Sequence, residues 1–204
     1  MSPSQQDRPG PRAEKGVMSA RILAAARTCF AVNGLAATTV RQIAIAADVD
    51  PALVYHYFGS KQALLDACTT PTPQWAERIA ETWAAPRERL GELLVRNLIE
   101  NWNDPESAEV TRAVLLIAAH DATTREKLKM TIQQSLLNPA LPERDHSERL
   151  TRASLVASQL MGLAMVRYVW QIEPLASLSD EQIVAEIAPT IQSYIDRPLE
   201  VPNH

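Results

Sequence analysis

Apolar residues recur every three or four positions along most of the chain, which is the spacing of one face of an α-helix. The first such stripe runs through Ile22, Ala26 and Phe30, and Gly34 follows it as a stop signal. The alternation of apolar and polar residues that is typical of β-strands is hard to find. The pattern therefore predicts an all-α fold.

Prolines and capping residues divide this pattern into about nine to ten helices. Thr39 and Gln42 have the spacing of a capping box, and Asp50 precedes a proline at a first helical position. Pro189 lies inside the last apolar stripe and predicts a kink there. The expected helices lie at about 19–33, 40–47, 51–58, 60–68, 74–84, 86–103, 105–119, 121–137, 147–173 and 179–196.

The prolines also predict how the chain is organised into domains. Pro71 and Pro73 interrupt the fourth stripe, which indicates a hinge over residues 69–73. We expect four parts. They are a flexible N-terminal arm at 1–18, a first helical domain at 19–68, a larger second domain at 74–196 and a C-terminal tail at 197–204.

The composition is that of a globular protein rather than a disordered one. The 204 residues are 46% hydrophobic and 22% charged, with 20 Lys and Arg against 24 Asp and Glu. No apolar run approaches the roughly 20 residues of a membrane-spanning helix, and the polar beginning lacks the apolar core of a signal peptide. We therefore expect a cytoplasmic protein with two reduced cysteines. Four histidines without metal-ligand spacing argue against a metal, and no cofactor is expected.

Two short helices joined by a tight turn, at 40–47 and 51–58, are typical of a helix-turn-helix, whose second helix enters the DNA major groove. Asp48 stands where a turn glycine is usual, and Asp adopts the left-handed conformation more readily than most residues. Small or apolar residues occupy the positions where the two helices must touch, namely Ile43, Ala44, Ala47, Val49 and Val54. This segment therefore indicates a DNA-binding domain.

The stretch from Ala37 to Cys68, ATTVRQIAIAADVDPALVYHYFGSKQALLDAC, resembles the DNA-binding domain of the TetR family of bacterial transcriptional regulators. The resemblance covers about residues 19–68. From residue 74 onward the chain has the helix number and length of that family's ligand-binding and dimerisation domain, and residues 160–195 are similar to an actinobacterial-type subgroup of it. The resemblance implies a dimeric repressor that a small, largely apolar effector releases from an inverted-repeat operator.

Position by position, the resemblance assigns DNA contacts to nine residues. They are Thr39 and Arg41 on the second helix, Pro51, Ala52 and Leu53 against bases, and Tyr55, His56, Tyr57 and Lys61 against the DNA backbone. Arg41 is also compatible with a solvated surface charge, and Tyr57 with a core residue. Lys61 lies at a helix start, where its charge is unfavourable unless a phosphate partners it.

The second domain carries aromatic, apolar and polar side chains that suit an effector pocket, and the resemblance implies one there. The candidates are Trp75, Trp83, Trp102, Arg112, Leu116, His120, Met130 and Gln133. Each apolar candidate has a core role as its alternative, because large apolar side chains usually fill the centre of a helical bundle.

The last two helices carry apolar stripes that predict a dimer surface, at which two copies form a four-helix bundle. The stripe residues are Leu155, Gln159, Gly162, Leu163, Val166, Trp170, Ile183, Ile187, Ile191 and Tyr194. The core of a single chain could bury one of these two stripes but hardly both. The other is therefore expected to lie in the dimer interface.

Other functions have less support. The run RDHS at residues 144–147 places Asp, His and Ser side by side, but adjacent residues in a polar loop do not align a nucleophile with its base, so an enzyme is not expected. An activator of the same fold, or a ligand-binding module without specific DNA binding, stays open. The charge distribution favours DNA binding at the N-terminal part, because residues 1–68 hold 7 basic and 5 acidic side chains while residues 69–204 hold 13 and 19.

Overall fold

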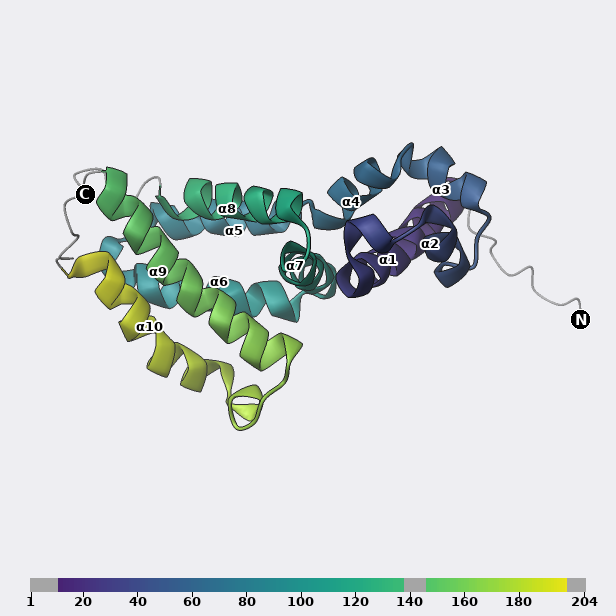
Figure 1. The fold of residues 1–204 in the computed structure, drawn as a ribbon. Helices are drawn as coiled ribbons and strands as arrows, with labels where there is room; N and C mark the ends of the chain where they lie inside the picture. Colours follow the sequence, from purple (N-terminus) through teal and green to yellow (C-terminus); the bar gives the residue numbers. More distant parts are fainter. Residues whose placement is uncertain (1–10, 138–145, 198–204) are drawn as a thin grey trace, which may run out of the picture. The chain divides into compact units, whose positions relative to one another are not determined.

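The computed structural model describes residues 11–137 and 146–197, and in these two stretches the chain forms ten α-helices and no β-strand (Figure 1). The helices are α1 (Pro11–Ala37), α2 (Val40–Ala46), α3 (Pro51–Phe58), α4 (Lys61–Thr69), α5 (Pro73–Ala84), α6 (Leu90–Asn103), α7 (Pro105–Ala118), α8 (Ala122–Leu137), α9 (His146–Ala164) and α10 (Asp180–Asp196). This confirms the predicted all-α fold. No helix of the described chain is long and apolar enough to cross a membrane.

Helix α1 begins at Pro11, so the expected flexible arm is wrong for residues 11–18. Proline is tolerated in a first helical turn, where its missing amide hydrogen would have no helical partner, and the residues after it favour helix. Gly34 adopts a φ of 71° and breaks the helical geometry where the stop was predicted. Residues 1–10 of the arm, the loop at 138–145 and residues 198–204 of the tail lie outside the described residues.

The chain divides into two compact units. Unit 1 comprises the residues up to Thr70 together with 113–121. Its core joins α1–α4 to the second half of α7, and the buried members are Ile22, Ala26, Phe30, Val40, Ile43, Ala44, Ala47, Val54, Leu64, Leu65, Cys68, Ala113 and Ile117. The expected second domain at 74–196 is therefore not continuous, because apolar residues of α7 are buried in unit 1.

Unit 2 comprises Pro71–Arg112 and the residues from Ala122 onward. Helix α10 packs along α6, and α9 adds apolar side chains to the same core. The buried members are Leu90, Leu94, Val95, Ile99, Val156, Leu163, Ile183, Val184, Ala188, Ile191 and Ile195. Gly91 permits the close approach of α6 to α10, because a Cβ at this position would lie 2.5 Å from the carbonyl oxygen of Ala188.

The helix expected over 147–173 ends earlier than its apolar pattern suggests. Helix α9 stops at Ala164 and passes into a π-helical turn, η2 (Met165–Val169), after which Gln171 has a φ of 52°. A short 3-10 turn, η3 (Leu175–Ser177), then leads to α10. This irregular segment between α9 and α10 places side chains beside the C-terminal end of α6 and beside Arg112 of α7, and single-turn π-helices recur at functional sites.

Candidate nucleic-acid interface and ligand pocket

Local hydrogen bonds set the start of α2. The hydroxyl oxygen of Thr39 accepts from the backbone N–H of Gln42 at 3.2 Å, and the Gln42 side-chain oxygen accepts from the Thr39 N–H at 2.7 Å. These reciprocal bonds form the predicted capping box. They leave Thr39 exposed at the helix N-terminus, where unpaired N–H groups and the helix dipole favour an anion such as phosphate.

The turn between α2 and α3 has a long-range partner that the sequence did not reveal. Asp48 adopts the left-handed conformation, with a φ of 52°. Arg21 of α1 donates to the carbonyl oxygens of Ala47 at 2.5 Å and of Asp48 at 2.9 Å. The Asp50 carboxylate then accepts from the Ala52 N–H at 2.7 Å and starts α3. The guanidinium of Arg21 therefore holds the turn that orients α3.

The two helices bury the residues expected at their contact and expose most of the predicted DNA-facing residues. Ile43, Ala44 and Val54 are buried in the core of unit 1. The exposed members of the predicted set are Thr39, Arg41, Pro51, Ala52, Tyr55 and His56, and Leu53 is half-buried. The residues at the contact between the two helices are buried, and the outer faces of α2 and α3 are therefore exposed to solvent at the N-terminal turn of each helix.

Tyr57 and Lys61 have structural contacts of their own. Tyr57 is half-buried and packs on the core of unit 1, with its ring 5.4 Å from that of His56. The Lys61 ammonium donates to the carbonyl oxygens of Leu35 at 2.8 Å and of Thr38 at 2.9 Å. These carbonyls explain why a cation is tolerated at the start of α4 without a phosphate. A DNA contact of either residue stays a prediction.

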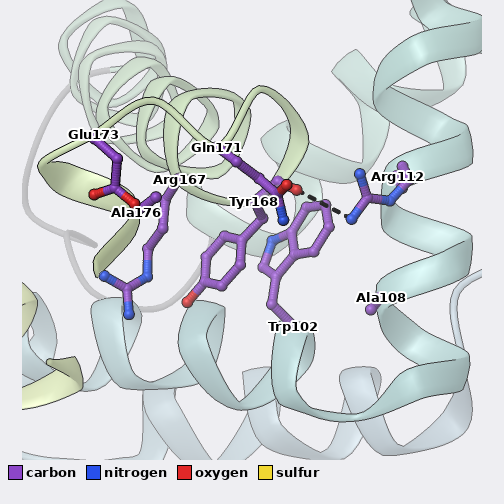
Figure 2. Close-up of a pocket in the computed structure, with 8 residues that line it drawn as sticks. All are labelled: Trp102, Ala108, Arg112, Arg167, Tyr168, Gln171, Glu173 and Ala176. Carbon is purple, nitrogen blue, oxygen red and sulfur yellow. Dashed lines mark hydrogen bonds between the residues drawn. The ribbon is translucent and has the colours of Figure 1, made fainter. Parts of the chain in front are cut away.

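The irregular segment between α9 and α10 lines a hollow of about 530 Å³ in unit 2 (Figure 2). Its walls are Trp102 from α6, Ala108 and Arg112 from α7, Arg167 and Tyr168 from η2, and Gln171, Glu173 and Ala176 from the segment that follows. Trp102 and Arg112 were predicted as ligand-binding residues. The other six were missed. For Arg167, Tyr168, Gln171 and Glu173 the reason is that the sequence pattern continued α9 through residues whose irregular backbone only the fold establishes.

Four side chains form a stack along one side of this hollow (Figure 2). The rings of Trp102 and Tyr168 are 4.8 Å apart and inclined by 2°. The guanidinium of Arg112 lies 5.3 Å from the Trp102 ring centre, and that of Arg167 lies 5.3 Å from the Tyr168 ring centre. Each outer layer is thus a cation over an aromatic face, an arrangement that is electrostatically favourable.

The remaining predicted ligand-binding residues do not gather at this hollow. Leu116 and His120 belong to unit 1, where the His120 side chain lies beside Gly34. Trp83 packs against the apolar core of unit 2, and Met130 is exposed on α8. Trp75 and Gln133 are also absent from the lining. The apolar residues among them were candidates because they lie on apolar helix faces. In the fold these faces do not all point toward the hollow.

The predicted dimer surface needs a correction. Ile183 and Ile191 of α10 are 0% exposed and Leu163 of α9 is 5% exposed, so these side chains have no surface left for a partner. Helix α6 covers the α10 stripe, which is the intramolecular alternative. Leu155, Gln159, Val166, Ile187 and Tyr194 are partly exposed, while Gly162 and Trp170 are exposed. What remains for a partner is mainly the α9 side and the segment after it.

The cysteines are poor candidates for chemistry. Burial raises the pKa of the Cys68 thiol to about 12, although Arg27 nearby opposes this shift. Burial also raises the pKa of Cys29. Thiolate is the reactive form, so neither residue has the character of a nucleophile.

Family models match both parts of the chain. Residues 22–68 match the model described as bacterial regulatory proteins, tetR family, and residues 88–195 match the model described as tetracyclin repressor-like, C-terminal domain. The first match covers α2, α3 and most of α1 and α4. The second covers α6–α10, including every residue that lines the hollow.

Curated and solved proteins agree with these models. The HTH-type transcriptional repressor KstR2 of Mycolicibacterium smegmatis is 32% identical over 94 residues, which are 44% of this chain and 43% of KstR2, so the chain matches less than half of that relative's length. The TetR-family regulator SCO0857 of Streptomyces coelicolor A3 is 29% identical, with a TM-score of 0.60 over 95% of this chain and 100% of that one. Salmonella enterica GusR has the same fold at 23% identity, with a TM-score of 0.54 over 88% of this chain and 93% of its own.

Both matched segments carry the features derived above, namely capped helices that expose a face around Arg41 and Tyr55, and a helical unit with an open hollow. The chain belongs to the TetR family of bacterial transcriptional regulators.

Proposed function

We propose that this protein is a sequence-specific DNA-binding repressor that acts as a dimer on an inverted-repeat operator and is released by a small-molecule effector. The observation that carries the proposal is the exposed outer face of α2 and α3. Arg41 is the second residue of α2 and its side chain is exposed, and Pro51, Ala52 and Tyr55 are exposed along the start of α3. A short, capped second helix with a free N-terminal face is the form that enters a major groove.

Base recognition on this face rests on few side chains. Arg41 supplies the hydrogen-bonding fork that recognises guanine, and Pro51 and Ala52 offer apolar contact to thymine methyl groups. Thr39, Tyr55, His56 and Lys61 contact the DNA backbone, which positions α3 in the groove. Leu53 and Tyr57, which are half-buried, complete the contact surface at its edge.

The dimer surface lies on α9 and the segment after it. Trp170 is 60% exposed and Ile172 is 49% exposed, and such large apolar side chains at the surface are more stable when a partner covers them. Leu155, Gln159, Gly162 and Val166 extend this surface along α9, and Ile187 and Tyr194 contribute from α10. A twofold dimer presents two α3 helices, so its operator is an inverted repeat with half-sites about one DNA turn apart or more.

The effector acts through the hollow of unit 2. Helix α7 contributes Arg112 to the hollow, and the next residue, Ala113, is buried in the core of unit 1. A ligand that displaces Arg112 therefore acts on a helix that also belongs to the DNA-binding unit. A coupling of about 1–3 kcal/mol between the two sites is sufficient for release.

The test begins with selection of bound sequences from random double-stranded oligonucleotides by the purified full-length protein. Enrichment of an inverted repeat supports the proposal. Fluorescence anisotropy then measures the affinity of variants for the selected site. Arg41→Ala is expected to weaken binding by about 1–3 kcal/mol and to relax the preference at one base pair, while Tyr55→Ala weakens binding to all sequences alike.

Arg89→Ala is the matched control, because it removes the same charge from an exposed position in unit 2. Its affinity and salt dependence stay close to those of the wild type. If selection yields no preferred sequence, the protein is a ligand-binding module without specific DNA binding. If the selected site lies upstream of a promoter whose transcription rises when the protein is present, the protein is an activator.

A further inference from the structure

The hollow of unit 2 is short of hydrogen-bond acceptors. Within the described part of the chain, three buried polar atoms of its lining have no hydrogen-bond partner: the indole Nε1 of Trp102, the hydroxyl of Tyr168 and the Nε of Arg167. The indole N–H and the guanidinium N–H are donors only, and the tyrosine hydroxyl donates as long as it is protonated. Burial raises the pKa of Tyr168, so this hydroxyl stays protonated at neutral pH.

Unpaired buried donors are uncommon in folded proteins, because each has lost its hydrogen bond to water without a replacement. The Arg167 guanidinium lies beside the Tyr168 hydroxyl and interacts with it. The Trp102 N–H has no such neighbour, and it lies on a ring stacked against that of Tyr168, so these two donors point to one missing acceptor. The irregular backbone at the same place, a π-helical turn followed by a left-handed Gln171, costs conformational energy and places two of the three residues here.

The two arginines that line the hollow differ in whether an acidic side chain balances their charge. Arg167 forms an ion pair with Asp180 at 3.1 Å and donates to the Leu175 carbonyl at 3.0 Å. Arg112 is exposed and donates to the carbonyl oxygen of Tyr168 at 3.0 Å, but no acidic side chain of the described residues pairs with it. The hollow thus offers one guanidinium whose charge is not balanced by any acidic side chain of the described stretches.

We propose, building on the effector site of the proposed function, that this hollow binds a small organic molecule through a single carboxylate, which pairs with Arg112 and accepts from the Trp102 N–H or the Tyr168 hydroxyl. Arg112 lies over the face of Trp102, so one carboxylate can pair with the guanidinium and accept from the indole N–H at the edge of the same ring. The single negative charge of the carboxylate balances the positive charge of Arg112. A phosphate dianion exceeds that balance and is repelled by Glu173, which also lines the hollow.

The experiment measures binding to the full-length protein without DNA, by isothermal titration calorimetry. The probes are benzoate, 3-phenylpropionate and hexanoate, each compared with its uncharged amide and with inorganic phosphate. At least one carboxylate is expected to bind about tenfold or more tightly than its amide, because a hydrogen bond to a charged group is stronger than one between neutral groups.

Variants then locate the site. Arg112→Gln lowers the affinity for the carboxylate about tenfold or more and leaves the affinity for the amide unchanged. Arg112→Lys keeps the charge without the planar fork and gives an intermediate affinity, which also serves if Arg112→Gln does not fold. Tyr168→Phe and Trp102→Phe keep the rings and remove the donors, so each weakens carboxylate binding severalfold. Arg89→Gln, outside the hollow, leaves binding unchanged.

Three results overturn the proposal: no carboxylate binds more tightly than its amide, phosphate binds as tightly as the carboxylates, or Arg112→Gln and Arg89→Gln weaken binding equally. Adding the same probes to the complex with selected DNA separates this inference from the proposed function. Carboxylate binding without release of DNA supports the inference and contradicts the effector role. Release of DNA by the amides alone supports the effector role and contradicts the carboxylate.

Discussion

The ammonium group of Lys61 donates a hydrogen bond of 2.9 Å to the carbonyl oxygen of Thr38, and a second bond of 2.8 Å to that of Leu35. These bonds join the start of α4 to the segment between α1 and α2. Thr38 directly precedes Thr39, which caps α2, so Lys61 positions the helix that carries Arg41. An ammonium has three donors, and the third is available for a DNA phosphate.

Lys61→Met keeps most of the aliphatic stem and removes both hydrogen bonds. We expect it to lower the free energy of unfolding by about 1–2 kcal/mol, because two carbonyl oxygens lose a charged donor. Urea denaturation followed by circular dichroism measures the change. Gln62→Met, at the next and exposed position, is the control and stays close to the wild type. Equal stability of both variants and the wild type contradicts a structural role of Lys61.

Gly91→Ala tests the close crossing of α6 and α10. The new Cβ lies 2.5 Å from the Ala188 carbonyl oxygen and 2.8 Å from the Gln192 N, so the helices must move apart, at a cost of about 1–3 kcal/mol. Gly16→Ala places its Cβ in open space on α1, where alanine favours helix by roughly 0.5–1 kcal/mol. Thermal denaturation compares the two. A stabilising effect at both glycines shows that the crossing is not tight.

Trp170→Glu tests the dimer surface. A charge at this position, which is 60% exposed, leaves the single chain intact but is costly to bury in an apolar interface, so the variant is expected to sediment as a monomer. Met130→Glu is the matched control, because Met130 is an apolar side chain of similar exposure, 50%, on α8. Analytical ultracentrifugation distinguishes the outcomes. A Trp170→Glu protein that remains dimeric places the interface elsewhere.

The two ion pairs of Arg96 on α6, with Glu181 of α10 and with Glu92 of α6, predict how stability depends on pH. Hydrogen bonds from Arg96 hold the pKa of Glu181 and of Glu92 below the usual value of 4.5. A carboxylate with a lowered pKa in the folded state stabilises the fold above the unfolded value, and this contribution is lost as the pH falls through the folded-state pKa. We therefore expect the free energy of unfolding to fall as the pH decreases from about 4.5.

Glu181→Gln should flatten this decrease, since an amide does not titrate. The measurement is urea denaturation across a pH series from neutral to acidic conditions. Glu186→Gln is the control, because Glu186 is exposed on the same helix and keeps both ion pairs of Arg96 intact. If Glu181→Gln and the wild type have the same pH dependence, solvent screens the ion pair of Arg96 with Glu181 completely.

Arg152 has a structural role that its residue type does not predict. It is a charged residue of α9, yet it is 1% exposed. Its guanidinium pairs with Glu148 and donates to the carbonyl oxygens of Tyr194, Ile195 and Arg197, which end α10. An arginine is usually exposed to solvent. The fold instead uses this side chain to satisfy the carbonyl groups at a helix C-terminus.

The features that the sequence determined by itself are those set by neighbouring residues. The capping box of Thr39 and Gln42 and the Asp50 cap each depend on atoms within a few positions, so the helix-turn-helix can be read from the sequence, although Arg21 of α1 also holds the turn at Asp48. The all-α fold is legible for the same reason, because helical hydrogen bonds and apolar stripes repeat over three or four residues.

Tertiary structure alone decided which stripes face each other and where the backbone leaves ideal geometry. Ile183 and Ile191 became core residues because α6 covers them, a pairing between segments about 90 residues apart that no local spacing encodes. The hollow formed because a π-helical turn carries Arg167 and Tyr168 toward Trp102 and Arg112. Long-range packing is a property of the whole chain, and for this reason the exposed face of α2 and α3 was largely predictable from the sequence whereas the hollow of unit 2 was not.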